Sequence, residues 1–123
     1  MHSMAEPVVV GIGATSSATA EECLDAIRRV VGSDCVIVGV ATIAGKEQLI
    51  ESVADALGVP WSTWPAEMLD RIDVPDPSDF VRGATGSASI AEAAALLAGG
   101  GGRLLVGKAR DGNVTIAVSG GTT

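Results

Sequence analysis

The stretch PVVVGIGATSSATAEECLDAIRRVV, residues 7–31, contains the pattern from which the fold can be predicted. Residues 7–13 are apolar and rich in β-branched side chains, as expected for a buried strand. Apolar side chains then recur at helical spacing over residues 20–31, and Thr19 with Glu22 has the capping-box spacing that starts a helix. The stretch therefore predicts a strand, a glycine-containing loop and a helix.

The same unit occurs a second time. Residues 35–41 form a continuous apolar run of strand length, and residues 49–57 have apolar side chains at helical spacing before Gly58 ends the helix. Residues 61–64 are predicted to form at most a short strand, and residues 65–72 a brief helix that starts with proline. Alternating strands and helices are typical of a sheet covered by helices.

A third segment, GATGSASIAEAAALL at residues 83–97, joins a glycine loop to a helix of small residues. Ser89 and Glu92 again have the capping-box spacing, so we expect this helix to start near Ile90 and to end at Gly99. The amides of a helix start favour anions, although a plain cap without a ligand uses the same residues.

The C-terminal part predicts a β-hairpin. Residues 103–110 and 113–119 have the character of strands, and Asp111-Gly112 between them is a strong hairpin signal. The predicted fold class is therefore α/β, with a single-domain mixed β-sheet sandwiched by helices and ending in an antiparallel hairpin.

Length and composition suit one compact domain, since the chain has 123 residues of which 47% are hydrophobic. We expect the domain to cover residues 4–119, residues 1–3 to be the remnant of an expression tag, and residues 120–123 to be a flexible tail. The apolar runs are too short to cross a bilayer, and nothing in the sequence has the character of a signal peptide. A cytoplasmic protein without a membrane partner is expected.

Charge and residue content exclude several functions. Eight basic and fifteen acidic side chains give a net charge of -7, which repels nucleic acid. The single histidine, His2, lies in the presumed tag, which excludes Ser-His and Cys-His catalytic pairs and a histidine metal site. Cys23 and Cys35 are expected to be reduced core residues. We expect neither a metal nor a cofactor.

Ligands of such sheets collect at the carboxyl ends of the parallel strands. The loops at residues 13–18 and 42–46 are expected there, and the loop at residues 83–89 is a third candidate. A cation at the start of the second helix opposes the helix dipole, which favours a ligand role for Lys46, and a solvated surface lysine is the alternative. The candidate ligand-binding residues are Gly13, Thr15, Ser16, Thr42, Lys46, Gly86, Ser87, Ser89 and Lys108.

Five stretches in order carry a resemblance to a known family: VVVGIGATSSATAEE at 8–22, VGVATIAGKEQL at 38–49, PSDFVRG at 77–83, GSASIAEAAALL at 86–97 and RLLVGKARDGNVTIAVS at 103–119. Together they resemble the CobE/CbiG C-terminal-type domain of cobalamin (vitamin B12) biosynthesis. In that family the domain occurs alone in the aerobic pathway. In the anaerobic pathway it is the last part of a longer protein, which opens a lactone on the corrin ring and releases acetaldehyde.

The chain departs from this family in two loops. Many members have a cysteine and basic residues where this chain has Ala14, Thr15 and Ser16, and Ala44 replaces an acidic residue of the second loop. We therefore transfer a binding role to the loops and assign no nucleophile or general base.

The resemblance implies a corrinoid or precorrin intermediate as ligand, and three functions follow as hypotheses. The first is an accessory protein that binds this intermediate without catalysis. The second is a hydrolase, like cobalt-precorrin-5A hydrolase, that acts on the ring-A lactone of a precorrin with water activated by Glu92 or Glu47. The third is a scaffold for other enzymes of the cobalamin pathway, suggested by the apolar helix after Ser89.

Overall fold

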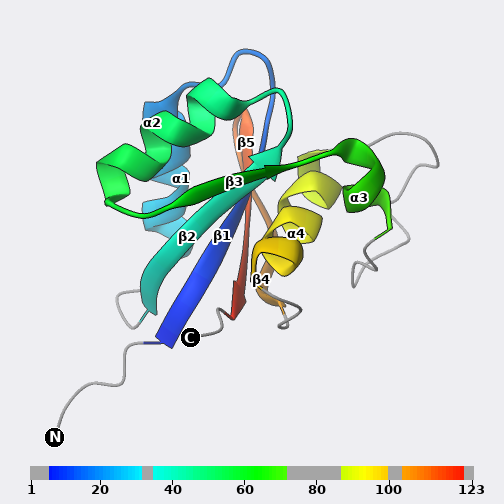
Figure 1. Ribbon diagram of the computed structural model, residues 1–123. Coiled ribbons are helices and arrows are strands. Elements are labelled where there is room, and N and C mark those ends of the chain that lie inside the picture. Colours follow the sequence, from blue (N-terminus) through cyan, green and yellow to red (C-terminus); the bar gives the residue numbers. More distant parts are fainter. Residues whose placement is uncertain (1–5, 32–34, 72–86, 100–103, 121–123) are drawn as a thin grey trace, which may run out of the picture.

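The computed structural model describes residues 6–31, 35–71, 87–99 and 104–120. The elements follow one another along the chain as β1 (Glu6–Ala14), α1 (Ala20–Val30), β2 (Cys35–Ile43), α2 (Glu47–Leu57), β3 (Trp61–Trp64), α3 (Ala66–Asp70), α4 (Ser87–Ala98), β4 (Leu104–Asp111) and β5 (Val114–Gly120) (Figure 1). Gly120, which was expected in the tail, is the last residue of β5.

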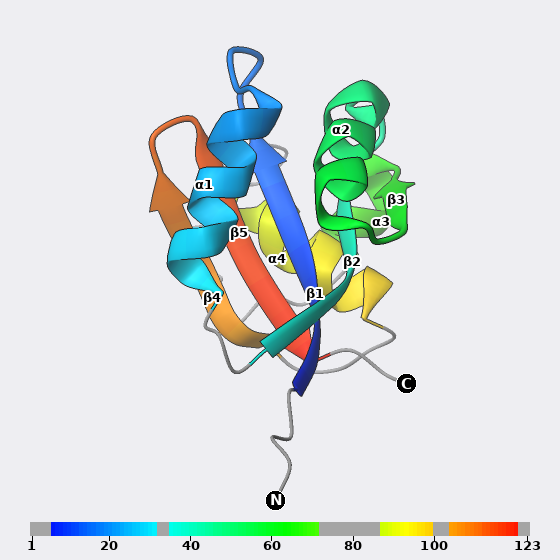
Figure 2. The same cartoon turned by 90° about the vertical axis from the view of Figure 1, so that its left-hand side faces the viewer.

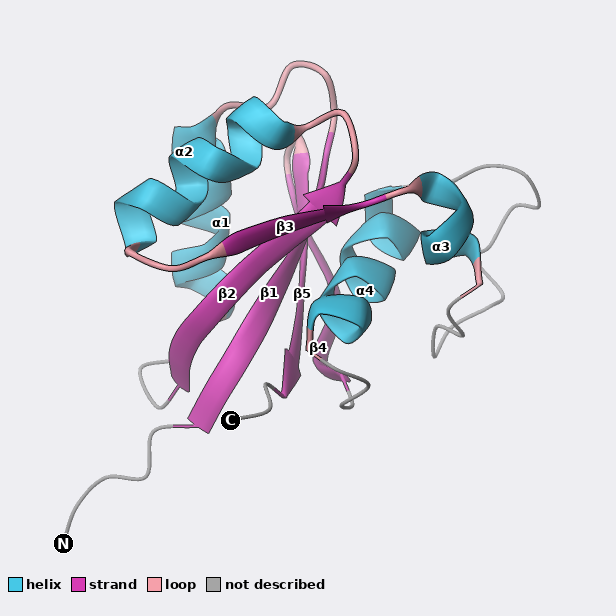
Figure 3. Cartoon of the chain, in the orientation of Figure 1, coloured by secondary structure: helices cyan, strands magenta, loops and turns pink. Residues whose placement is uncertain are grey.

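The described strands form one mixed sheet in the order β3-β2-β1-β5-β4. β1, β2 and β3 are parallel, whereas β5 runs antiparallel to both β1 and β4. This confirms the predicted α/β class, the mixed sheet and the antiparallel pair at the end of the chain. The parallel strands all point their carboxyl ends to the same edge of the sheet, where the loops after β1 and β2 lie (Figure 3).

Helices cover both faces of the sheet. α1 and α2 lie over one face and α4 over the other (Figure 2). Side chains alternate along β1, so Val8, Val10 and Ile12 pack against α1 and α2 in the main core. Gly11 faces α4, whose buried small residues Ala91, Ala93, Ala94 and Ala95 lie close to the sheet. The apolar character of α4 is therefore explained by its packing.

Local signals at the ends of α1 and α2 are confirmed. The Thr19 hydroxyl accepts a hydrogen bond from the Glu22 N–H at 3.2 Å, and the Glu22 carboxylate accepts one from the Thr19 N–H at 3.1 Å. This is the complete capping box. At the C-terminal end of α2, Gly58 ends the helix with φ 71°, a left-handed conformation that favours glycine.

The capping box predicted at Ser89 and Glu92 is wrong. α4 begins at Ser87, so Ser89 is already the third helical residue and cannot be the cap. Glu92 is only 3% exposed and faces β4, since a Cβ built on Gly107 would lie 2.9 Å from Glu92 Oε2. The Glu92 side chain is buried between α4 and the sheet, which keeps it away from the helix start.

The hairpin turn is displaced by one residue from its predicted position. Asp111 pairs with Val114, so the loop consists of Gly112 and Asn113. Gly112 has φ 63°, whereas no non-glycine residue among those described has a positive φ, which is the type II′ pattern. Pairing across the strands decides this register, because a shift by one residue would turn the core side chains of β5 toward the opposite face.

Candidate functional site

A hollow of about 420 Å³ lies where β1 and β2 end. It is formed by the loop after β1, the loop after β2 and the first turn of α2. Its lining residues are Thr15, Ser16, Ala18, Gly45, Lys46, Glu47, Gln48 and Leu49. The position agrees with the predicted one, since ligands of parallel sheets bind at the carboxyl ends of the strands.

Lys46 connects the two loops. It immediately precedes α2, and its side chain makes no capping hydrogen bond. The Lys46 Nζ donates to the Thr15 carbonyl oxygen at 3.4 Å, which is a long contact for a hydrogen bond. Lys46 forms no ion pair within the described ranges. The result is a cation held at the positive end of the α2 dipole, an unfavourable position for a positive charge, although the first turn also carries the Glu47 carboxylate.

Thr15 is fixed by its backbone but not by its side chain. Its N–H donates to the Asn113 carbonyl at 3.0 Å, and its carbonyl accepts from the Ala18 N–H at 3.1 Å as well as from Lys46. In contrast, Thr15 Oγ1 is buried and has no hydrogen-bond partner among the described residues. A buried hydroxyl without a partner costs about 1–3 kcal/mol, so this atom requires an explanation.

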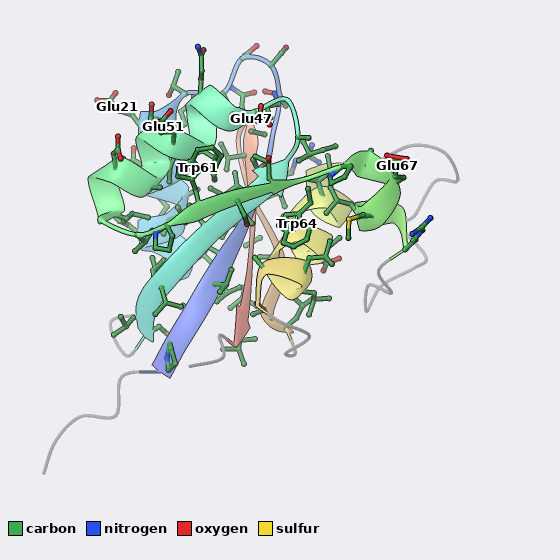
Figure 4. The ribbon with its side chains drawn as sticks, viewed as in Figure 1. Glu21, Glu47, Glu51, Trp61, Trp64 and Glu67 are labelled. Atoms are coloured by element: carbon green, nitrogen blue, oxygen red, sulfur yellow. The ribbon has the colours of Figure 1, made fainter. Side chains whose placement is uncertain are left out.

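Glu47, labelled at the start of α2 in Figure 4, lines the hollow and contacts Thr63 on β3. Its two carboxylate oxygens accept hydrogen bonds from the Gly45 N–H at 3.0 and 3.2 Å, and the Thr63 hydroxyl donates to one of them at 3.2 Å. Gly45 adopts φ 104°, which favours glycine at this position. These bonds lower the pKa of Glu47, with the Gly45 N–H as the largest cause. A carboxylate stabilised in its charged form is a weak general base.

Two of the predicted site residues lie in the strands that lead to the hollow. The Thr42 side chain is 1% exposed, and its hydroxyl donates to the Ile12 carbonyl at 2.6 Å, so it ties β2 to β1. Gly13 is buried within β1. Both residues support the loops, but neither lines the hollow.

Other predicted residues lie elsewhere. Ser87 and Ser89 are in the first turn of α4, which covers the opposite face of the sheet from α1 and α2 (Figure 2). Lys108 is on β4, which β5 separates from β1. Gly86 lies outside the described residues. Of the nine candidates, the structure therefore brings Thr15, Ser16 and Lys46 together in one hollow.

Sequence reasoning missed the residues that hold these loops in place. Asn113 supports Thr15 from the hairpin, and Thr63 supports Glu47 from β3. Neither contact has a local signal, because the partners are far apart in the sequence. The glycine between Ala44 and Lys46 is a signal that could have pointed to the left-handed turn at Gly45.

The prediction of reduced core cysteines holds for Cys23, whereas Cys35 at the start of β2 is only partly buried against the core. Cys23 is completely buried in the main core, and both Cys23 and Cys35 are unpaired thiols. Burial, with a smaller contribution from Glu22, raises the pKa of Cys23 to about 11. At neutral pH the thiol is therefore protonated and a poor nucleophile.

Comparison with known proteins identifies the family. A family model described as cobalamin synthesis G C-terminus matches residues 8–119. The chain belongs to this family. No curated protein matches the chain. No helix among the described residues is long and apolar enough to span a membrane.

Solved structures agree with membership in the cobalamin synthesis G C-terminus family. CobE, a protein from the cobalamin (vitamin B12) biosynthetic pathway, is 28% identical with a TM-score of 0.73, covering 100% of this chain and 96% of CobE. Cobalamin biosynthesis protein chiG from Agrobacterium tumefaciens str. C58 is 27% identical with a TM-score of 0.65, and the match covers 94% of this chain and 99% of chiG. A cobalamin biosynthesis protein G homolog from Sulfolobus solfataricus shares the fold at 24% identity and a TM-score of 0.75, covering 96% of this chain and 38% of that one.

Proposed function

We propose that this protein is an accessory protein of cobalamin biosynthesis that binds a corrinoid or precorrin intermediate at the hollow after β1 and β2. The observation that carries the proposal is the position of Lys46, an ammonium group without an ion pair among the described residues, in a hollow at the carboxyl ends of parallel strands. Membership in a family named for cobalamin synthesis supports the class of ligand.

The size of the hollow limits how such a ligand binds. Pockets of about 300–1,000 Å³ enclose drug-sized molecules, and a corrin ring with all its arms is larger than these. A hollow of about 420 Å³ therefore takes one arm, while the flat apolar ring lies across its mouth. This mode leaves most of the ring accessible, as suits a protein that holds an intermediate and passes it on.

Electrostatic attraction between this protein and a ligand with carboxylates must come from individual groups at the site. The net charge of -7 repels a ligand edged with carboxylates at long range. A charge-assisted hydrogen bond contributes about 1.5–3 kcal/mol, so a bond from Lys46 can offset part of this repulsion.

The structure does not favour the other two hypotheses. Glu92 lies against β4 on the α4 face of the sheet, which the hollow does not reach. The Glu47 carboxylate accepts hydrogen bonds from the Gly45 N–H and the Thr63 hydroxyl. Although this carboxylate lines the hollow, it is stabilised in its charged form and is therefore a weak general base. The small residues of α4 that suggested a docking helix are buried against the sheet.

A visible absorption titration with hydrogenobyrinic acid tests the proposal. We expect a saturable change in the corrin bands with the wild-type protein. Lys46→Gln should weaken binding about tenfold or more, because it removes a charge-assisted bond. Arg28→Gln is the matched control, since it makes the same change in net charge on an exposed side chain in the last turn of α1. Absence of saturable binding, or equal losses in the two variants, would refute a corrinoid site at this hollow.

A further inference from the structure

We infer that the hollow recognises a carboxylate arm that has not been amidated, and that the Lys46 ammonium and the Thr15 hydroxyl are the pair of groups that bind it. This inference rests on the proposed function and specifies the chemistry of the ligand. It also accounts for two features of the site that packing leaves unexplained: a cation at a helix start and a buried hydroxyl without a partner.

The first step concerns Lys46. The only hydrogen bond that its side chain makes to a described residue is the 3.4 Å contact to the neutral Thr15 carbonyl. An ammonium group gains more from a carboxylate than from a carbonyl, and charge-assisted bonds are shorter, at about 2.7–2.9 Å. The Thr15 carbonyl keeps its bond from the Ala18 N–H when Lys46 leaves it. A carboxylate that enters the hollow can therefore draw the Lys46 side chain away at little cost.

The second step concerns Thr15. Its N–H and carbonyl both have backbone partners, so the hydroxyl is the one polar group of this residue left to bind a ligand. Oγ1 is covered in the unliganded protein, so a ligand reaches it only after the groups that cover it have moved.

The third step distinguishes a carboxylate from an amide. The Lys46 ammonium can only donate, and an ionised carboxylate accepts with a full negative charge. An amide carries no charge, although its oxygen can accept from Lys46 and its N–H groups can donate to the Thr15 hydroxyl. The Glu47 carboxylate at the side of the hollow accepts from Gly45 and Thr63 and has further acceptor capacity, so an amide can find hydrogen-bond partners here but adds no charge for Lys46. The positive charge of Lys46 therefore favours a carboxylate over an amide, because only the carboxylate brings a negative charge to it.

Two corrinoid probes test this specificity, namely dicyanocobyrinic acid, whose arms end in carboxyl groups, and the same corrinoid with every arm converted to the amide. Wild-type protein should bind the acid about tenfold or more tightly than the amide, as estimated from the strength of a charge-assisted bond. Lys46→Gln should lose most of this preference, and Thr15→Val should lose a smaller part of it. Thr15→Ser, which keeps the hydroxyl, and the control Arg28→Gln should retain it.

The outcomes separate this inference from the proposed function. If neither corrinoid binds, the proposed function fails. If both bind equally well and the Lys46 and Thr15 variants behave as wild type, the protein binds corrinoids but the carboxylate pair is refuted. If Thr15→Val keeps the full preference while Lys46→Gln loses it, the role of the Thr15 hydroxyl is refuted. Circular dichroism of each variant verifies that a loss of binding is not a loss of folding.

Discussion

Gly11 on β1 lies directly against the backbone of Ala95 on α4. A Cβ built on Gly11 would be 2.6 Å from the Ala95 nitrogen and even closer to the Ala91 carbonyl oxygen. Both neighbours are backbone atoms of a helix, which cannot move away alone. The absence of a side chain at position 11 therefore sets how closely α4 approaches the sheet.

The first prediction follows from this contact. Gly11→Ala should lower the free energy of unfolding by about 1–3 kcal/mol or more, because α4 must shift to admit the methyl group. Gly39→Ala is the matched control on β2, where the nearest atom to an added Cβ is the Pro60 oxygen at 3.7 Å, an ordinary contact. Urea denaturation measures both variants. Equal stability of the two would contradict the close packing of α4.

Thr15→Val tests the unpartnered hydroxyl through the stability of the unliganded protein. Valine has nearly the same shape as threonine and removes the buried polar atom, so we expect the free energy of unfolding to rise by about 1 kcal/mol. The same variant is expected to bind the carboxylate corrinoid more weakly, which a structural role alone would not cause. A clear loss of stability would indicate that the hydroxyl has a hydrogen-bond partner in solution.

The contribution of Glu47 to the free energy of unfolding should depend on pH in the acid range. Hydrogen bonds, first from the Gly45 N–H, lower the pKa of this carboxyl below its ordinary value of 4.5. A group with a lowered pKa in the folded state stabilises the fold above its unfolded pKa, and this contribution is lost as the pH falls through the folded value. The difference in unfolding free energy between wild type and Glu47→Gln should therefore be largest near neutral pH and shrink in acid.

Denaturation at a series of pH values from neutrality to below 4.5 measures this difference. Glu51→Gln makes the same charge change at an exposed position of α2 and is the control. If Glu51→Gln shows the same pH dependence as Glu47→Gln, the effect arises from net charge and the specific role of the Gly45 bond is wrong.

Cys23 should be unreactive in the folded protein. The thiol is completely buried, and its pKa is raised to about 11 mainly by burial. In a Cys35→Ser variant, which leaves Cys23 as the single thiol, we expect no reaction with a thiol reagent at neutral pH until denaturant is added. Rapid labelling under native conditions would show that α1 opens readily from the core.

The sequence alone was sufficient to predict the features that depend on a few neighbouring residues. The capping box of Thr19 and Glu22, the end of α2 at Gly58 and the order of strands and helices are all confirmed. Each results from hydrogen bonds or hydrophobic periodicity within one or two turns of chain, which are visible in the sequence itself. The five ordered stretches likewise indicated the family that the comparison confirms.

Tertiary structure decided the features that depend on residues far apart. The spacing of Ser89 and Glu92 predicted a cap, but Glu92 is buried against Gly107, and pairing of Asp111 with Val114 moved the hairpin turn. In the hollow, Lys46 meets the Thr15 carbonyl across 31 residues. Local patterns cannot distinguish a capping side chain from a buried one, because packing between distant elements, and not spacing along the chain, determines which partner each polar group reaches.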